Sequence, residues 1–190
     1  MAMPTRASAV STIEELLALP DDGMRHELLD GVHVVTPAPR LSHQAVLGEL
    51  SYMLRRGLEG STDFMLLASP ADIVLGPKTL VQPDLFVIHK PADVRLAQWS
   101  DVGVPVLAIE FLSPSTAARD RGAKRRIYQR AGVAEYWIVD SDARLVERWR
   151  PDDERPEILT EILQWDPGTG MTPAVIDLRQ LFRQALGDEP

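Results

Sequence analysis

The chain has 190 residues, which fits one domain, and its 45% hydrophobic and 25% charged residues exclude a protein that is disordered throughout. It contains no cysteine, which excludes disulfides, thiolate metal sites and cysteine nucleophiles and fits a cytoplasmic protein. Twenty Lys and Arg residues face 28 Asp and Glu residues, and the net charge of −8 disfavours a globally basic nucleic-acid-binding protein.

The N-terminal residues 1–10 are expected to form a disordered lead before a single domain at residues 11–190. The lead has no apolar segment typical of a signal peptide, and no apolar run in the chain approaches the length of a membrane helix. Thr12 and Glu15 have the spacing of a capping box, which predicts a short helix ending at Pro20.

Two further elements follow in the N-terminal third. The pair Asp30-Gly31 separates two apolar runs, and this pattern predicts a β-hairpin over residues 25–35. Apolar residues then recur at helical spacing over residues 42–59, which predicts a long amphipathic helix with Ser42 as its N-cap.

The pattern in the middle of the chain predicts strands followed by a helix. Residues 63–75 and 81–88 are strand-like, and residues 104–112 are apolar on both faces, as expected for a central buried strand. A helix is expected over residues 116–131, with Gly132 terminating it.

The C-terminal part predicts a second hairpin, a strand and a helix. The hairpin joins residues 135–140 to residues 144–150, the strand covers residues 157–164, and the helix begins near Asp177. This order indicates a mixed α/β (α+β) protein with one main sheet, flanking helices and additional β-hairpins. Glycine-rich dinucleotide and P-loop motifs and the GxSxG motif are absent.

Two carboxylates stand inside apolar strand segments. Asp84 begins one such run and Glu110 lies within another, and a buried carboxylate is costly unless it is paired, hydrogen-bonded or bound to a metal. Either residue alone could cap a helix or pair with an Arg. Two like charges on consecutive strands favour a shared cation.

A basic helix follows the second of these strands directly. Asp120, Lys124 and Tyr128 are spaced four residues apart and are expected on one face, where Asp120 could pair with Lys124. From Arg119 to Arg130 the helix carries six basic residues and one acidic residue. Its arginines could form a solvated face, whereas Lys124 is the stronger functional candidate.

Two carboxylates and a lysine are typical catalytic residues of a metal-dependent phosphodiesterase. Carboxylate oxygens suit a hard cation such as Mg²⁺ or Mn²⁺, which polarises a phosphate and activates water. Lys124 would orient that water or neutralise the charge developing on phosphorus. Asp84, Glu110 and Lys124 are therefore the candidate catalytic residues.

These residues resemble the Uma-type family of bacterial restriction endonucleases, long described as a domain of unknown function, in the PD-(D/E)XK nuclease superfamily. The resemblance covers roughly residues 20–150, and its most specific part runs from Glu110 to Asp140. Its landmarks are Glu27-Leu28-Leu29-Asp30-Gly31, Ser42-His43-Gln44, Pro83-Asp84, Glu110, Ser113-Pro114-Ser115-Thr116, Asp120, Lys124, Tyr128, Ala131-Gly132-Val133 and Glu135-Tyr136-Trp137-Ile138-Val139-Asp140.

The resemblance implies a restriction-endonuclease-like core in which Asp84 and Glu110 hold a divalent metal. It also implies that the backbone carbonyl of Phe111 is a further metal ligand. One departure is visible, because Leu112 stands where the superfamily motif has its lysine. Lys124 on the following helix would replace that lysine.

Four supporting residues each have two interpretations. His43 could contact a phosphate or cap a helix, and Glu27 could bind the metal or pair with Lys124. Asp72 could join the acidic cluster or face solvent. Tyr128 could orient Lys124, or pack against the sheet with its hydroxyl group satisfied.

The leading hypothesis is a metal-dependent DNA endonuclease, with Arg121, Arg125 and Arg126 contacting the DNA backbone. A homodimer is expected by analogy with nucleases that cut both strands, and no membrane association is expected. The alternative is a catalytically inactive nuclease-fold module for DNA binding or protein interaction. A weaker alternative is a hydrolase acting on a small phosphorylated molecule.

Overall fold

The computed structural model describes residues 10–95, 98–168, 170 and 172–188. Nearly all of the expected N-terminal lead, residues 1–9, lies outside this described part. Within it, no helix is both long enough and apolar enough to cross a membrane.

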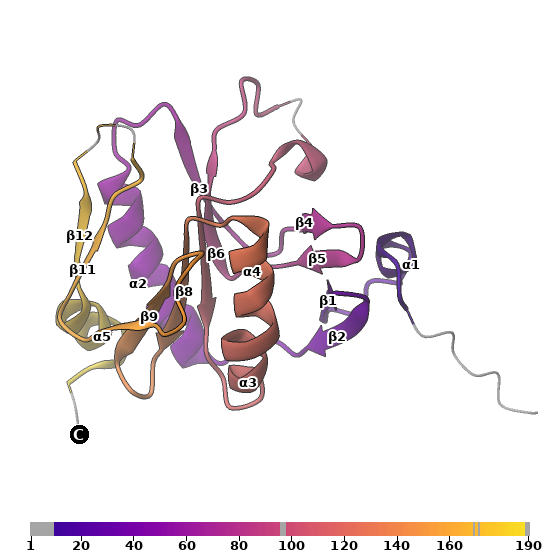
Figure 1. Cartoon of the computed structure of the whole chain (residues 1–190). Coiled ribbons are helices and arrows are strands. Elements are labelled where there is room, and N and C mark those ends of the chain that lie inside the picture. The colour runs from indigo at the N-terminus through magenta and orange to yellow at the C-terminus, as the bar shows by residue number, and fades with distance from the viewer. Residues whose placement is uncertain (1–9, 96–97, 169, 171, 189–190) are drawn as a thin grey trace, which may run out of the picture.

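A six-stranded mixed sheet forms the centre of the molecule (Figure 1). Its strand order is β10 (Glu157–Leu159), β9 (Leu145–Trp149), β8 (Glu135–Asp140), β7 (Leu107–Phe111), β6 (Leu85–His89) and β3 (Phe64–Ala68). The pair β7–β8 is parallel and the other pairs are antiparallel. All residues of β7 are buried, which confirms the prediction of a central buried strand.

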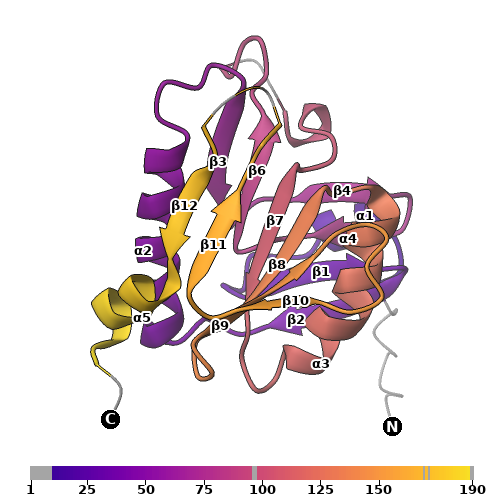
Figure 2. The ribbon, with the colours of Figure 1, turned by 60° about the vertical axis from the view of Figure 1, so that its left-hand side comes forward.

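One face of this sheet packs against helices and a small hairpin. The covering elements are α2 (Leu41–Gly57), β11 (Ile162–Trp165), β12 (Ala174–Asp177) and α5 (Leu178–Leu186). Successive strand residues point to opposite faces, so Leu107, Ile109 and Phe111 all enter this core. In Figure 2 the hairpin β11–β12 lies in front of β3 and β6, and α5 lies below it.

The opposite face of the sheet is covered by a helix and a second sheet (Figure 1). The helix is continuous through α3 (Ala117–Arg119), η2 (Asp120–Lys124), which is a π-helical turn, and α4 (Arg125–Ala131). The second sheet has the order β2 (Val32–Thr36), β1 (Arg25–Leu29), β5 (Thr79–Val81) and β4 (Ile73–Gly76). Helix α1 (Ile13–Leu17) packs on β1, and η1 (Trp99–Asp101) is a short 3₁₀ turn.

Several local predictions are confirmed by backbone geometry. Thr12 and Glu15 form the capping box of α1, and Asp177 caps α5 by accepting the backbone N–H of Gln180. Asp30 and Gly31 have φ values of 52° and 86°, as a two-residue hairpin turn of the primed type requires. Gly132 ends α4 with φ of 81°.

Other boundaries differ from the sequence predictions. Helix α2 begins at Leu41 after Arg40, so Ser42 lies inside its first turn and is not the N-cap. The run 63–75 forms β3 and β4, which belong to different sheets, because the chain turns at Ser69-Pro70. The run 157–164 likewise divides into β10 and β11 in separate sheets, and β12 and η1 were not predicted.

Candidate active site

The two strand carboxylates meet on the face of the sheet that lies under the helix α3–η2–α4. Leu85 pairs with Ile109 across the antiparallel strands β6 and β7, and continuing this register by one residue places Asp84 opposite Glu110. Side chains alternate along each strand, so both carboxylates point away from the α2 core. Asp84 is 2% exposed and Glu110 is 3% exposed.

Asp84 is held by neighbours on three sides. The backbone N–H of Phe111 donates to Oδ2 at 2.8 Å, and the Arg25 guanidinium lies 2.8 Å from Oδ1. His43 Nε2 is 3.6 Å from the same oxygen. Burial raises the pKa of Asp84, but His43, Arg25 and the Phe111 N–H outweigh burial and lower it to about 2. Asp84 is therefore a carboxylate at neutral pH.

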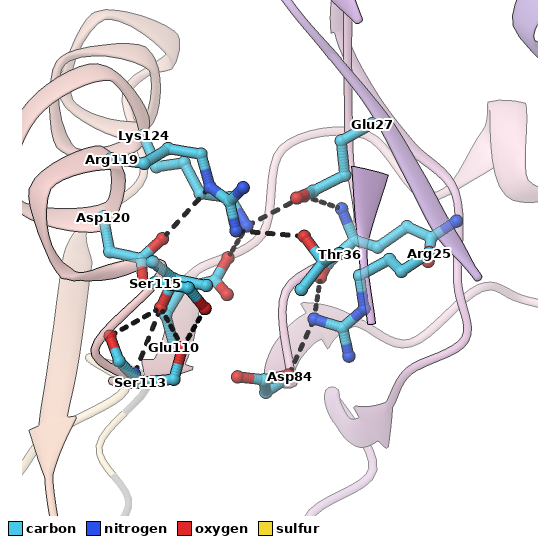
Figure 3. Close-up of polar contacts among 12 residues, drawn as sticks. Arg25, Glu27, Thr36, Asp84, Glu110, Ser113, Ser115, Arg119, Asp120 and Lys124 are labelled. Atoms are coloured by element: carbon cyan, nitrogen blue, oxygen red, sulfur yellow. Dashed lines mark hydrogen bonds and ion pairs between the residues drawn. The ribbon is translucent and has the colours of Figure 1, made fainter. Parts of the chain in front are cut away.

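Glu110 belongs to a buried ion-pair cluster (Figure 3). Lys124 Nζ lies 2.5 Å from Glu110 Oε1 and 2.8 Å from Glu27 Oε1. The Tyr128 hydroxyl donates to Glu110 Oε1 at 2.8 Å, and the backbone N–H of Gln82 donates to Glu27 Oε1 at 2.8 Å. Glu27 lies on β1, Glu110 on β7, and Lys124 and Tyr128 on the helix α3–η2–α4. The cluster therefore joins both sheets to the helix.

The buried charges respond to their surroundings in different ways. The pKa of Glu110 is raised to about 8. Burial is the largest cause, the nearby carboxylates Asp84 and Glu27 raise it further, and Lys124 only partly offsets these effects. Burial would lower the pKa of Lys124, but the surrounding carboxylates outweigh it and raise that pKa. Lys124 therefore stays charged, whereas Glu110 holds a proton more readily than an exposed glutamate does.

The π-helical turn brings Asp120 and Lys124 into the interior together with Tyr128. All three side chains are buried, so the predicted shared face is confirmed. The predicted Asp120–Lys124 pair is replaced by contacts of Lys124 with Glu27 and Glu110. Asp120 Oδ1 instead lies 3.7 Å from Arg119 Nε, and burial raises the pKa of Asp120.

A cavity of about 290 Å³ opens beside the two carboxylates. Asp84, Glu110 and Phe111 line it, whereas Lys124, Glu27 and Tyr128 do not. Its rim comes from the β2–α2 connection, the start of the helix α3–η2–α4 and the β8–β9 turn. The lining residues are Arg25, Thr36, Pro37, Ala38, Pro39, Arg40, Ser42, His43, Asp84, Glu110, Phe111, Leu112, Ser113, Pro114, Ser115, Thr116, Arg119, Asp120, Ser141 and Asp142.

The basic residues of this cavity differ from the three predicted arginines. Arg121 lies 2.6 Å from Glu147 and 3.2 Å from Asp140, and the Arg125 guanidinium lies 4.8 Å from the Trp149 ring centre. Arg126 is exposed. The structure places none of these three in the cavity lining, which instead includes the arginines 25, 40 and 119.

Two of these cavity residues were missed although the sequence carried a signal. Arg25 is two residues before Glu27 on β1, and alternate residues of a strand share a face. Arg119 stands one turn before Lys124, and its NH2 group donates to Thr36 Oγ1 at 3.0 Å. Of the supporting residues, His43 lines the cavity, whereas Asp72 accepts a hydrogen bond from Gln82 Nε2 and lies outside the lining.

The donor set fits a hard divalent cation. In the described part of the chain no three His, Cys, Asp or Glu side chains are arranged to hold a metal, so the candidate centre rests on two carboxylates. Mg²⁺ commonly binds through one or two carboxylates, with waters and substrate phosphates as its other ligands. Asp84 Oδ1 is buried and accepts no hydrogen bond in the described structure, and the Lys124 and Tyr128 contacts of Glu110 both use Oε1.

The fold and this site together define a nuclease-like α+β protein. The chain belongs to the Uma2 family, described as "Putative restriction endonuclease", whose model matches residues 13–171. It is similar over 92% of its length to 99% of a solved Anabaena variabilis ATCC 29413 structure, with TM-score 0.76 and 20% identity; that structure is titled a putative nuclease belonging to DUF820. An uncharacterized protein of Synechocystis sp. (strain PCC 6803) is 28% identical over 132 residues, which is 68% of each chain. These findings confirm the family and the fold expected from the sequence.

Proposed function

We propose that this chain is a Mg²⁺- or Mn²⁺-dependent DNA endonuclease that hydrolyses phosphodiester bonds. The observation that carries the proposal is the pair Asp84 and Glu110, which stands at the wall of an open cavity bordered by three arginines. The membership of the Uma2 family supports the same reaction class. Fold alone does not establish a reaction, so the proposal rests on the site.

The proposed roles follow from the contacts of each residue. Asp84, Glu110 and the backbone carbonyl of Phe111 would hold the cation, which supplies Lewis-acid activation of the phosphate and of a water. Lys124 holds Glu110 from behind and adds positive charge under the carboxylate pair. Because Lys124 is 1% exposed and does not line the cavity, its burial favours electrostatic stabilisation over direct contact with the attacking water.

The proposed substrate is DNA, bound through its phosphates. The cavity residues Arg25, Arg40 and Arg119 would meet the reacting segment, and Arg121, Arg125 and Arg126 would contact flanking phosphates. Such contacts give salt-sensitive affinity without sequence specificity. We further propose a cytoplasmic homodimer, which sedimentation analysis of the purified chain would test.

Cleavage of supercoiled plasmid tests the proposal directly. We expect nicked and linear products with Mg²⁺ or Mn²⁺ and none with a chelator. Glu110→Ala and Lys124→Ala should both be inactive, and a folded surface variant such as Arg126→Ala should retain cleavage with a weaker DNA affinity. Absence of cleavage by the wild-type protein with either metal, on supercoiled, linear and single-stranded DNA, would contradict the proposal.

One observation favours a second candidate, a catalytically inactive nuclease-fold module. Lys124 already pairs with Glu27 and Glu110 inside the protein, and the Tyr128 hydroxyl donates to Glu110, so these charges have partners in the absence of a metal. In an inactive module, Asp84→Ala and Glu110→Ala would leave DNA or partner binding unchanged. The nuclease instead requires both variants to lose cleavage and the thermal stabilisation that Mg²⁺ provides.

A further inference from the structure

Arg25 lies beside the Asp84 oxygen that the proposed cation would use. It is the first residue of β1, its side chain lines the cavity, and its NH1 atom lies 2.8 Å from Asp84 Oδ1 (Figure 3). Asp84 Oδ2 is already occupied by the Phe111 N–H. Oδ1 is therefore the oxygen of Asp84 that is available to a metal, and Arg25 is the positive charge beside it.

The contact of Arg25 with Asp84 is an ion pair between the NH1 atom and Oδ1. Arg25 NH1 donates to the backbone carbonyl of Gln82 at 3.2 Å, whereas Asp84 Oδ1 accepts no hydrogen bond in the described part of the chain. An ion pair without a shared hydrogen bond lacks the geometric strength of a bidentate arginine–carboxylate pair. Arg25 NH1 is thus shared between Asp84 and the Gln82 carbonyl, and a divalent cation can compete with it for Oδ1.

The other buried carboxylates of the cluster have their own cations. Lys124 lies against Glu27 and Glu110, and Arg119 Nε lies 3.7 Å from Asp120 Oδ1. Arg25 thus completes a set in which each acidic side chain has a basic neighbour. A divalent cation on Asp84 adds two positive charges at the point where Arg25 stands, and like charges so close repel.

We propose that Arg25 is an exchangeable counter-ion of the candidate metal centre. It neutralises Asp84 before the metal binds, and it is displaced into the cavity when a divalent cation takes Asp84 Oδ1. There its guanidinium group binds a phosphate of the substrate. This inference rests on the proposed function, because it assigns a substrate-binding role within the same site.

The side chain has the reach and the setting that this exchange needs. The Arg25 side chain lines the cavity and is 22% exposed, whereas the side chain of Asp84 is 3% exposed, so the guanidinium group can leave Asp84 without crossing the protein interior. Arg40 and Arg119 line the same cavity. A displaced Arg25 would join them in a cationic wall, and a planar guanidinium matches the geometry of two phosphate oxygens.

Metal titration of the purified full chain is the first test. We expect Arg25→Gln, which keeps a hydrogen-bond donor and removes the charge, to bind Mn²⁺ at least tenfold more tightly than the wild type by calorimetry. Arg119→Gln is the matched control, because it removes a cavity arginine that pairs with Asp120 and not with Asp84. An affinity that is unchanged or weaker in Arg25→Gln, or raised equally in Arg119→Gln, overturns the inference.

The salt dependence of DNA binding is the second test. With Ca²⁺ bound, we expect the slope of log Kd against log salt to fall by about 0.9 in Arg25→Gln, which is the loss of one phosphate contact. Without metal the slopes of the two proteins should agree, because Asp84 then holds Arg25. A reduced slope in both conditions would show that Arg25 contacts DNA without any exchange, and it would overturn the inference.

Two further outcomes distinguish a failure of the exchange from a failure of the proposed function. If the wild-type chain binds neither Mn²⁺ nor Ca²⁺, the proposed function itself fails. If it binds metal and cleaves DNA while Arg25→Gln shows no gain in metal affinity, only the exchange fails. Should Arg25→Gln not fold, Arg25→Lys replaces it, with an expected metal affinity above the wild type because the shorter side chain reaches Asp84 less well.

Discussion

Lys124 Nζ lies 2.5 Å from Glu110 Oε1, although the two residues belong to different elements, a helix and the central strand of the sheet. Glu110 and Leu112 line the cavity, whereas Lys124 does not. A lysine that is outside the cavity lining can stabilise the Glu110 carboxylate without occupying the cavity. This relationship determines what the most informative substitutions should do.

Lys124→Met should destabilise the fold strongly, because it leaves Glu27 and Glu110 buried without their shared cation. Breaking a buried ion pair by removing one partner typically costs about 3–5 kcal/mol. Chemical denaturation of the metal-free protein measures this change in the free energy of unfolding. Cleavage of plasmid DNA should be lost in the same variant.

A compensating variant separates stability from activity. Adding Glu27→Gln to Lys124→Met neutralises one of the two buried carboxyl groups left without a cation, so the double variant should recover part of the lost stability. It should still lack cleavage, because the positive charge beside Glu110 is gone. Recovery of cleavage would show that Lys124 serves only as a structural counter-charge.

The stability of the metal-free protein should fall as the pH rises from about 5 to 8. The pKa of Glu110 is raised by burial to about 8, so the folded protein retains a proton that the unfolded chain releases near its ordinary pKa of 4.5. This stabilisation is fully present below the ordinary pKa. It falls by about 1 kcal/mol per pH unit as the pH rises from that value, and it is lost once the pH exceeds about 8. Thermal melts in chelator across this range measure the effect.

Glu110→Gln is the control for this pH dependence, because its amide does not titrate. Its melting temperature should vary less with pH than that of the wild type over the same window. Mg²⁺ should also flatten the wild-type profile at high pH, since a metal ligand must be deprotonated. An identical slope in Glu110→Gln would assign the pH dependence to another group.

Tyr128→Phe should cost stability without removing the metal site. The change deletes a 2.8 Å hydrogen bond from the Tyr128 hydroxyl to Glu110 Oε1, and a typical hydrogen bond contributes about 0.5–1.5 kcal/mol to stability. Lys124 still holds the same oxygen, so the carboxylate should keep its place. Denaturation and Mn²⁺ titration together check this expectation, and a complete loss of metal binding would contradict it.

Much of the fold was predictable because its signals are local. The capping box at Thr12, the turn at Asp30-Gly31 and the glycine at 132 each require particular residues over only a few positions. Sheet membership depends on pairing between distant segments. Residues 63–75 and 157–164 each divide between two sheets, and no local sequence pattern indicated these divisions. The strand β12, which pairs with β11, has only four residues, too few for a clear alternating pattern in the sequence.

The candidate site shows the same division between local and distant information. Asp84 and Glu110 were accessible from the sequence because charges within apolar segments are unusual, and Lys124 was accessible because its helix directly follows the Glu110 strand. The partners that surround them come from distant segments, as with Glu27, whose Oε1 atom lies 2.8 Å from Lys124 Nζ. Arg25 was missed because an arginine at the start of a surface hairpin is ordinarily solvated, and only the fold brings it to Asp84.

Gly57→Ala should destabilise the protein, because the added methyl group would clash with β12 where α2 packs against it. An added Cβ atom at Gly57, the last residue of α2, would lie 2.4 Å from the Ala174 Cβ atom and 3.3 Å from its Cα atom. Overpacking a tight contact typically costs about 1–3 kcal/mol, which exceeds the gain of up to about 1 kcal/mol in helix propensity. The melting temperature should fall by a few degrees, at about 2–4 °C per kcal/mol for a chain of this size.

Adding Ala174→Gly removes the side chain that the new methyl group meets, so the double variant should be more stable than Gly57→Ala alone. Plasmid cleavage should persist in both variants at low temperature, because this contact lies in the core on the face of the sheet opposite Glu110.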